Sequence, residues 1–176
     1  MQQSDGLVLI MLARHAIEDC LNIENKTAFP HNSIKYGQKR GVFITLKAQH
    51  LLRGCIGCIV SDDPLYKSVP YFAVQAAFHD RRFKPITETE WTDIRIHLSI
   101  LSQPKAIDSI EQIKLGQHGI IFEYDAYRSV FLPEVAIEHH WDVDTLLIQL
   151  EQKALAPKDS WKKAKFKIFE TELFCE

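Results

Sequence analysis

The chain has 176 residues, of which 46% are hydrophobic and 25% charged, and its formal net charge is −2. These values are typical of a globular protein with its own core, and they exclude the strong basic field of a nucleic-acid-binding chain. The apolar run from Leu7 to Ala13 is broken by Arg14 and is too short to span a bilayer, so we expect no membrane association. The 4 scattered cysteines predict no disulfide framework and favour the cytoplasm.

The first predicted element is a helix that ends near Leu21. Apolar residues at helical spacing define its inner face: Leu9, Leu12, Ala13, Ala16, Ile17 and Cys20. Cys20 is therefore expected in the core, and Glu18 is expected to point away from it. Residues 22–40 are polar and have no clear period, which indicates a surface connection.

Residues 41–60 predict a β-hairpin. Its second strand lies in LLRGCIGCIV, residues 51–60, and contains two glycines, which strands usually avoid. Strict alternation of side chains would put one set on an apolar core face: Leu52, Gly54, Ile56 and Cys58. The opposite face would then carry Arg53, Cys55 and Gly57. The glycines suit positions of close backbone approach, beside a ligand or at a bulge.

The next elements are a helix after Pro64 and a strand over residues 94–101. Pro70 is expected to kink or restart the helix. In the strand IRIHLSIL, the apolar side chains face the core, and His97 lies on the polar face, where we expect packing rather than catalysis. A hairpin then turns around Asp125.

A helix capped by Asp142 follows and runs to about Ala154, and AKFKIFETELF predicts one closing strand. Hairpins dominate over parallel crossovers, so the fold class is α+β. We expect a mostly antiparallel or mixed sheet flanked by helices. The first helix should pack on a sheet that contains residues 41–60 and 94–101.

Cys55 and Cys58 spell Cys-x-x-Cys, and several interpretations stay open. No second pair of ligands stands at the spacing of a zinc site, so we expect no metal and no cofactor. A redox pair needs a helix N-terminus, whereas here a strand continues to Val60. Both cysteines are inert packing, or Cys55 is a reactive thiol beside the Arg53 guanidinium while Cys58 is buried. Cys175 would then be an exposed control.

LLRGCIG resembles the signature Leu-Arg-Gly-Cys-Ile-Gly of the AMMECR domain family, known in microbes as AmmeMemoRadiSam system protein A. Further blocks resemble the family in order along nearly the whole chain: LARHAI, GVFITLK, AAFHDRRFKPI, GQHGI and FLPEVA. The resemblance therefore implies a single domain over residues 1–176. The chain departs from the pattern at Glu134, where glutamine is usual, and at residues 153–157, which read Lys-Ala-Leu-Ala-Pro instead of Lys-Ala-Gly-Leu-Pro.

The resemblance implies an α+β fold with a larger and a smaller part and a cleft between them, and no established activity. It also implies partners, a Memo-like protein and a radical SAM protein, in a shared small-molecule or modification pathway. Two functions stay open. The chain is either a module that binds a small molecule or partner protein around the signature, or an enzyme or enzyme subunit that uses Cys55.

The candidate catalytic residues are Cys55 and His118, a loop histidine that could act as a base. The candidate ligand-binding residues are Arg53, Gly54, Gly57, Asp80, Arg82 and Glu134. Asp80 and Arg82 either grip an anion or form a surface ion pair. Glu134 points either into the cleft or into water.

Overall fold

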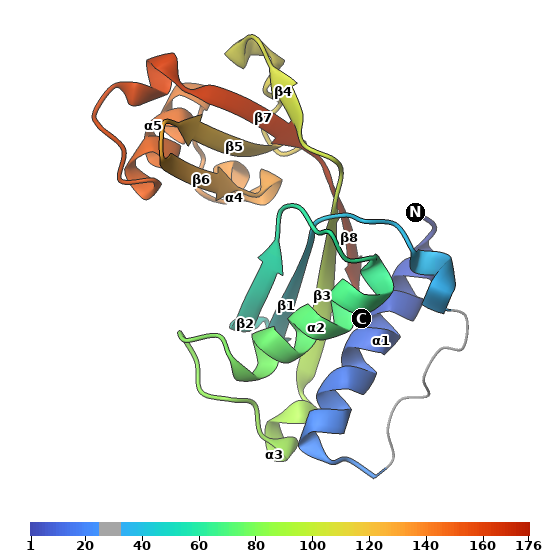
Figure 1. The fold of residues 1–176 in the computed structure, drawn as a ribbon. Helices are drawn as coiled ribbons and strands as arrows, with labels where there is room; N and C mark the ends of the chain where they lie inside the picture. Colours follow the sequence, from blue (N-terminus) through green and yellow to red (C-terminus); the bar gives the residue numbers. More distant parts are fainter. Residues whose placement is uncertain (25–32) are drawn as a thin grey trace. The chain divides into compact units, whose positions relative to one another are not determined.

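A computed structural model describes residues 1–24 and 33–176 and divides the chain into two compact units (Figure 1). The larger unit comprises Met1–Leu101 and Glu172–Glu176, and the smaller unit comprises Ser102–Thr171. Residues 25–32 of the expected connection over residues 22–40 therefore lie outside the described residues. A short 3-10 helix, η1 (Ser33–Tyr36), follows the gap.

The larger unit is built on a four-stranded sheet, here called sheet A. Its strand order is β2 (Leu51–Cys58), β1 (Val42–Ala48), β3 (Ile94–Leu101) and β8 (Thr171–Cys175). Strand β1 runs antiparallel to both of its neighbours. The prediction that residues 41–60 and 94–101 share one sheet is confirmed.

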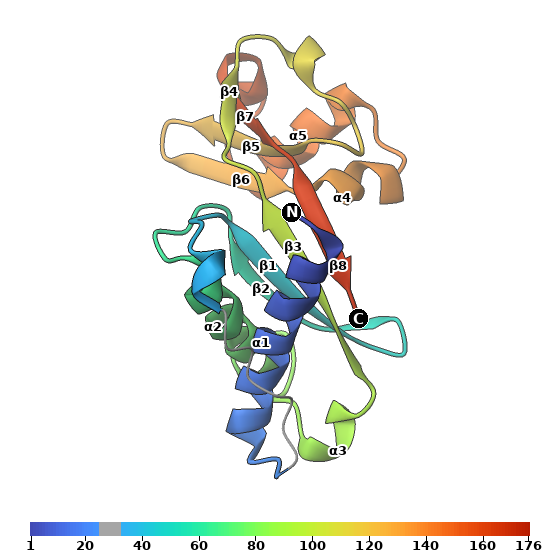
Figure 2. The same ribbon diagram turned by 90° about the vertical axis from the view of Figure 1, so that its right-hand side faces the viewer.

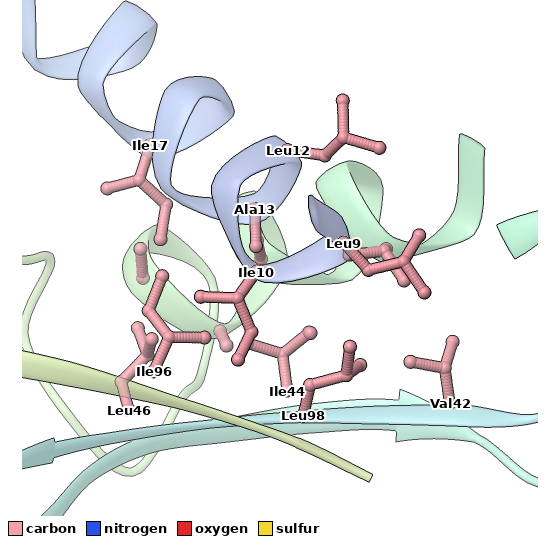
Figure 3. Packing of buried hydrophobic residues seen from close by; sticks show 14 of the residues in the cluster. Leu9, Ile10, Leu12, Ala13, Ile17, Val42, Ile44, Leu46, Ile96 and Leu98 are labelled. Atoms are coloured by element: carbon pink, nitrogen blue, oxygen red, sulfur yellow. The ribbon is translucent and has the colours of Figure 1, made fainter. Parts of the chain in front are cut away.

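Helices α1 (Gln3–Leu21) and α2 (Leu65–Phe78) cover one face of sheet A, and α2 continues through Pro70. Figure 3 shows side chains of α1 packed over those of β1 and β3. Alternate residues of each strand are fully buried in this core: Val42, Ile44, Leu46, Ile94, Ile96, Leu98 and Ile100. The predicted core faces of both strands are confirmed, and the opposite face of sheet A carries their polar neighbours.

Two expectations about the first helix are wrong. Cys20 is exposed rather than buried, whereas Glu18 is 6% exposed. Glu18 is buried because it has a polar partner inside the core: the indole nitrogen of Trp91 donates to the Glu18 carboxylate at 3.2 Å. Trp91 ends α3 (Glu88–Trp91), so a hydrogen bond across the fold holds a carboxylate where the periodicity predicts water.

The smaller unit is built on a second four-stranded sheet with two α-helices. The strand order is β4 (Lys105–Ile107), β7 (Lys165–Phe169), β5 (Gly119–Tyr124) and β6 (Tyr127–Phe131), with α4 (Pro133–Glu138), α5 (Val143–Lys153) and two short 3-10 helices, η2 (Ile110–Gln112) and η3 (Ser160–Lys163). The hairpin around Asp125 is confirmed. So is the Asp142 cap, whose carboxylate accepts the Thr145 N–H at 2.8 Å.

The predicted closing strand is in fact two strands that belong to different sheets. Strand β7 pairs in the smaller unit, and β8 joins sheet A; Figure 2 shows both in the red end of the chain. The break falls at Glu170, whose main chain binds Ser102 instead of either sheet, with the Ser102 N–H donating to the Glu170 carbonyl at 2.9 Å. The single-strand prediction is therefore wrong.

Leu155 occupies the position where the family pattern often has glycine. Its φ is 55°, in the left-handed region, and its side chain is 84% exposed. The Ala156 N–H donates to the Glu151 carbonyl at 3.1 Å, which closes the end of α5. Leucine therefore adopts here a backbone conformation that favours glycine.

Candidate functional site

Strand β2, which carries the signature, has a bulge at Arg53. Leu46 pairs with Gly54 but Lys47 pairs with Leu52, so Arg53 is the extra residue. The bulge shifts the alternation, and Leu52, predicted on the core face, is 43% exposed. From Gly54 onward the predicted alternation is correct, and Ile56 and Cys58 pack against the core.

The two signature glycines allow close approach of protein backbone. A Cβ on Gly54 would lie 2.2 Å from the Ala76 carbonyl oxygen in α2. A Cβ on Gly57 would lie 2.1 Å from the Val42 carbonyl oxygen in β1. Real Cβ atoms do not approach backbone this closely, so the sheet and α2 can pack at these distances only around glycine.

Asp80 and Arg82 close the free edge of β2 at Cys55. The Cys55 N–H donates to Asp80 Oδ2 at 2.9 Å, and Arg82 Nη2 donates to the Cys55 carbonyl at 3.0 Å. The two side chains also pair with each other, Nη2 to Oδ2, at 2.7 Å. The Arg82 guanidinium, assisted by the Cys55 and Arg82 N–H groups, holds the pKa of Asp80 well below its usual range although burial opposes this.

Arg53 anchors the chain that leads into β3. Its guanidinium donates to Glu90 Oε1 at 2.9 Å and to the Lys84 carbonyl at 2.8 Å. Glu90 also accepts the Thr87 N–H in a capping box, and Arg53 followed by this N–H lowers the pKa of Glu90 to about 2. Arg53 is thus held by its own partners, the Glu90 carboxylate and the Lys84 carbonyl.

The Cys55 side chain lies on the face of sheet A opposite the helices. It is half-buried, and the Thr45 hydroxyl donates to its sulfur at 3.2 Å. The pKa of Arg82 is raised mainly by Asp80 and in smaller part by Cys55. Arg82 is therefore a cationic neighbour of Cys55.

A row of polar side chains crosses this face from strand to strand. Thr45 pairs with Cys55 on one side and with His97 on the other, and His97 Nδ1 lies 3.0 Å from the sulfur of Cys175 on β8. We call these four residues the thiol row. With strands about 4.8 Å apart, its two cysteines are roughly 14 Å apart, too far for a disulfide.

Cys175 was expected to be an exposed thiol, but it is half-buried beside His97. That expectation is wrong, and the contact is what the sequence analysis missed. The alternation in β3 did place His97 on the polar face. Nothing in the sequence indicated that β8 lies next to β3, because that neighbour is set by the order of strands.

A pocket of about 490 Å³ adjoins the row at His97. Its other lining residues are Lys47, Gln49, His50, Asp93, Arg95 and Glu176. The Glu176 carboxylate is occupied by Arg14, with both oxygens 2.6 Å from the guanidinium. Lys47 and Arg95 are register partners on β1 and β3, so two cations stand side by side in this part of the face.

His118 and Glu134 belong to the smaller unit. His118 Nδ1 accepts the Lys114 N–H at 3.2 Å, and its Nε2 lies 4.0 Å from Glu170. Glu134 is exposed in the first turn of α4. The remaining candidates, Cys55, Arg53, Gly54, Gly57, Asp80 and Arg82, all gather at β2 in the larger unit.

Within residues 1–24 and 33–176, no group of three or more His, Cys, Asp or Glu side chains is arranged to bind a metal ion. Over the same residues, no helix is both long and apolar enough to cross a membrane.

The fold and the site define a mixed α+β protein. An Asp-x-Arg pair binds the edge of its antiparallel signature strand. The sequence profile of the AMMECR1 family matches residues 10–174, and the chain belongs to this family. It is 40% identical to a Methanococcus aeolicus protein, covering 80% of this chain and 76% of that one. It is 36% identical to a Methanocaldococcus jannaschii protein, covering 98% and 90%.

The fold also matches the crystal structure of an uncharacterised protein from Pyrococcus horikoshii. The TM-score is 0.87 at 31% identity, and the match covers 100% of this chain and 93% of that one.

The four cysteines differ in environment, so their labelling by a small alkylating reagent should differ. We expect Cys58 to label roughly tenfold or more slowly than exposed Cys20, because burial raises the pKa of the Cys58 thiol and thiolate is the reactive species. Peptide mass mapping over time measures both rates. In denaturant the two should label alike, and equal rates in the folded chain would show that Cys58 is not protected.

Proposed function

We propose that this chain is a ligand-binding protein whose site is the face of sheet A that carries the thiol row. It takes a small molecule or a side chain of a partner protein next to the signature strand. The observation that carries the proposal is the Asp80–Arg82 pair, which occupies the free edge of β2 at Cys55. An extended partner cannot pair with the strand there, so the signature presents its face, with the Cys55 thiol, rather than its edge.

The surroundings of Cys55 favour binding over catalysis. A thiol nucleophile works with a base at about 2.6–3.2 Å. The partner found for the Cys55 sulfur is the Thr45 hydroxyl, which donates a hydrogen bond and is no base at neutral pH. The alternative, a cysteine-dependent enzyme, is supported by the Arg82 guanidinium, a cationic neighbour of Cys55.

The proposal includes a cellular setting. Cytoplasmic location is supported by the cysteines, all of which are free. A role beside a Memo-like protein and a radical SAM protein is supported by the signature alone. A cleft built around the signature, as the family resemblance implies, belongs to the same proposal.

The test is native mass spectrometry of the full chain produced in the cells it comes from. We expect a mass increment that is kept under native conditions, is lost on denaturation, and falls at least severalfold in Cys55→Ala and Thr45→Val. Cys20→Ser, which changes an exposed cysteine far from the row, should keep the full increment. An absent increment, or one that survives both row variants, contradicts the proposal.

A further inference from the structure

The end of the thiol row opposite Cys55 holds a thiol and a base in contact. The Cys175 sulfur lies 3.0 Å from His97 Nδ1, across neighbouring strands β8 and β3. Both residues are half-buried, which holds the pair together while leaving part of it open to solvent. This distance suits transfer of the thiol proton to the imidazole.

The surroundings keep His97 in the form that can accept a proton. Burial of the ring, and then the positive charge of Lys47, lower the pKa of His97 against the opposing effect of Glu176. The imidazole is therefore neutral near neutral pH. When Nδ1 accepts the thiol hydrogen of Cys175, the ring proton resides on Nε2.

The pocket beside the pair offers more positive than negative charge to a ligand. Lys47 and Arg95 line it together with His97, and Asp93 is an acidic group on the same wall. The other acidic group, Glu176, is already paired with Arg14 and with the Ile96 N–H at 3.0 Å. A ligand that carries carboxylates would therefore meet two cations beside the thiol.

We propose that Cys175 and His97 form a thiol-exchange site for a small disulfide that carries carboxylates. The Cys175 proton moves to His97 Nδ1, and the sulfur attacks one sulfur of the disulfide. The disulfide bond breaks as the new S–S bond forms, and the released thiolate takes the proton from His97. The small disulfide is the only oxidant. One half of it is released as a free thiol, and the other half stays bound to Cys175 as a mixed disulfide.

This proposal is independent of ligand binding at Cys55. The experiment exposes the full chain at neutral pH to oxidised glutathione, which carries carboxylates, and separately to cystamine, which carries amines. Peptide mapping without reductant follows the mixed disulfide at each cysteine over time. We expect Cys175 to react with oxidised glutathione roughly 10- to 30-fold faster than exposed Cys20, because His97 accepts the thiol proton as the sulfur attacks.

Four variants sharpen the result. His97→Gln should bring Cys175 to the rate of Cys20, while His79→Gln, which changes an exposed histidine outside this pocket, should leave it fast. Lys47→Met should slow the reaction with oxidised glutathione severalfold and leave cystamine unaffected. Cys55→Ser should change nothing at Cys175, which separates this site from the proposed ligand site.

The proposal is overturned if Cys20 reacts as fast as Cys175 in the unaltered chain, or if cystamine reacts as fast as oxidised glutathione there. Both comparisons need no variant, so they hold even if His97→Gln fails to fold. A folded His97→Gln variant that keeps the fast rate overturns it as well.

Discussion

Asp80→Asn is expected to lower the free energy of unfolding of the larger unit by about 2–4 kcal/mol. The Asp80 carboxylate is 7% exposed and accepts from the Cys55 N–H at 2.9 Å and from the Arg82 Nη2 at 2.7 Å. An amide loses the charge and turns donor hydrogens toward at least one of these donors. Urea unfolding measures the loss, and hydrogen exchange at the Cys55 amide should become faster in the variant.

The same substitution should lose part of its effect in acid. The folded-state pKa of Asp80 is held below 3.8, the usual value for an aspartate, so its stabilisation is complete above that pH and declines as the pH falls below it. The gap between the two proteins at pH 7 should therefore narrow at pH 3. Asp62→Asn changes an exposed carboxylate of the same unit and serves as the matched control. A gap that is equal at both pH values would show that the charge of Asp80 contributes nothing.

Gly54→Ala is expected to cost about 2–3 kcal/mol and to disturb the thiol row. Its Cβ would lie 2.2 Å from the Ala76 carbonyl oxygen, which is backbone and cannot rotate away. Either α2 or β2 must shift, and Cys55, the next residue along β2, moves with the strand. Thermal unfolding reports the cost, and the labelling rate of Cys55 reports the displacement.

The control for Gly54→Ala is Val60→Ile, which also adds apolar volume just beyond β2 but at a side chain that is 60% exposed. It should leave both measurements within about 0.5 kcal/mol and twofold of the unaltered chain. Gly57→Ala should behave like Gly54→Ala, because its Cβ would meet the Val42 carbonyl oxygen. Stability unchanged by either alanine would mean that the close approach of β2 to its neighbours is not required.

Local patterns in the sequence were enough to predict most elements and their inner faces. The alternation of Val42, Ile44 and Leu46 identified the core face of β1, since side chains of a strand alternate whatever its neighbours are. Asp142 identified the start of α5 because an N-cap acts within one helical turn. The signature also drew attention to β2, where most of the candidate site residues do meet.

Contacts between residues far apart in the sequence determined the features that local patterns did not predict. Alternation alone could not reveal the bulge at Arg53, because a bulge is a property of two paired strands. Glu18 is buried only because Trp91, far along the chain, donates to it. The split of the last strand at Glu170 likewise depends on Ser102.

The thiol row shows most clearly which features follow from the sequence and which need the tertiary structure. The sequence by itself determined that Cys55 and His97 lie on polar strand faces, because that follows from the period of each strand. Only the tertiary structure decided that Thr45 lies between them and that Cys175 completes the row. Cross-strand neighbours depend on strand order and register, which are set by the packing of the whole sheet against α1 and α2 rather than by any local stretch.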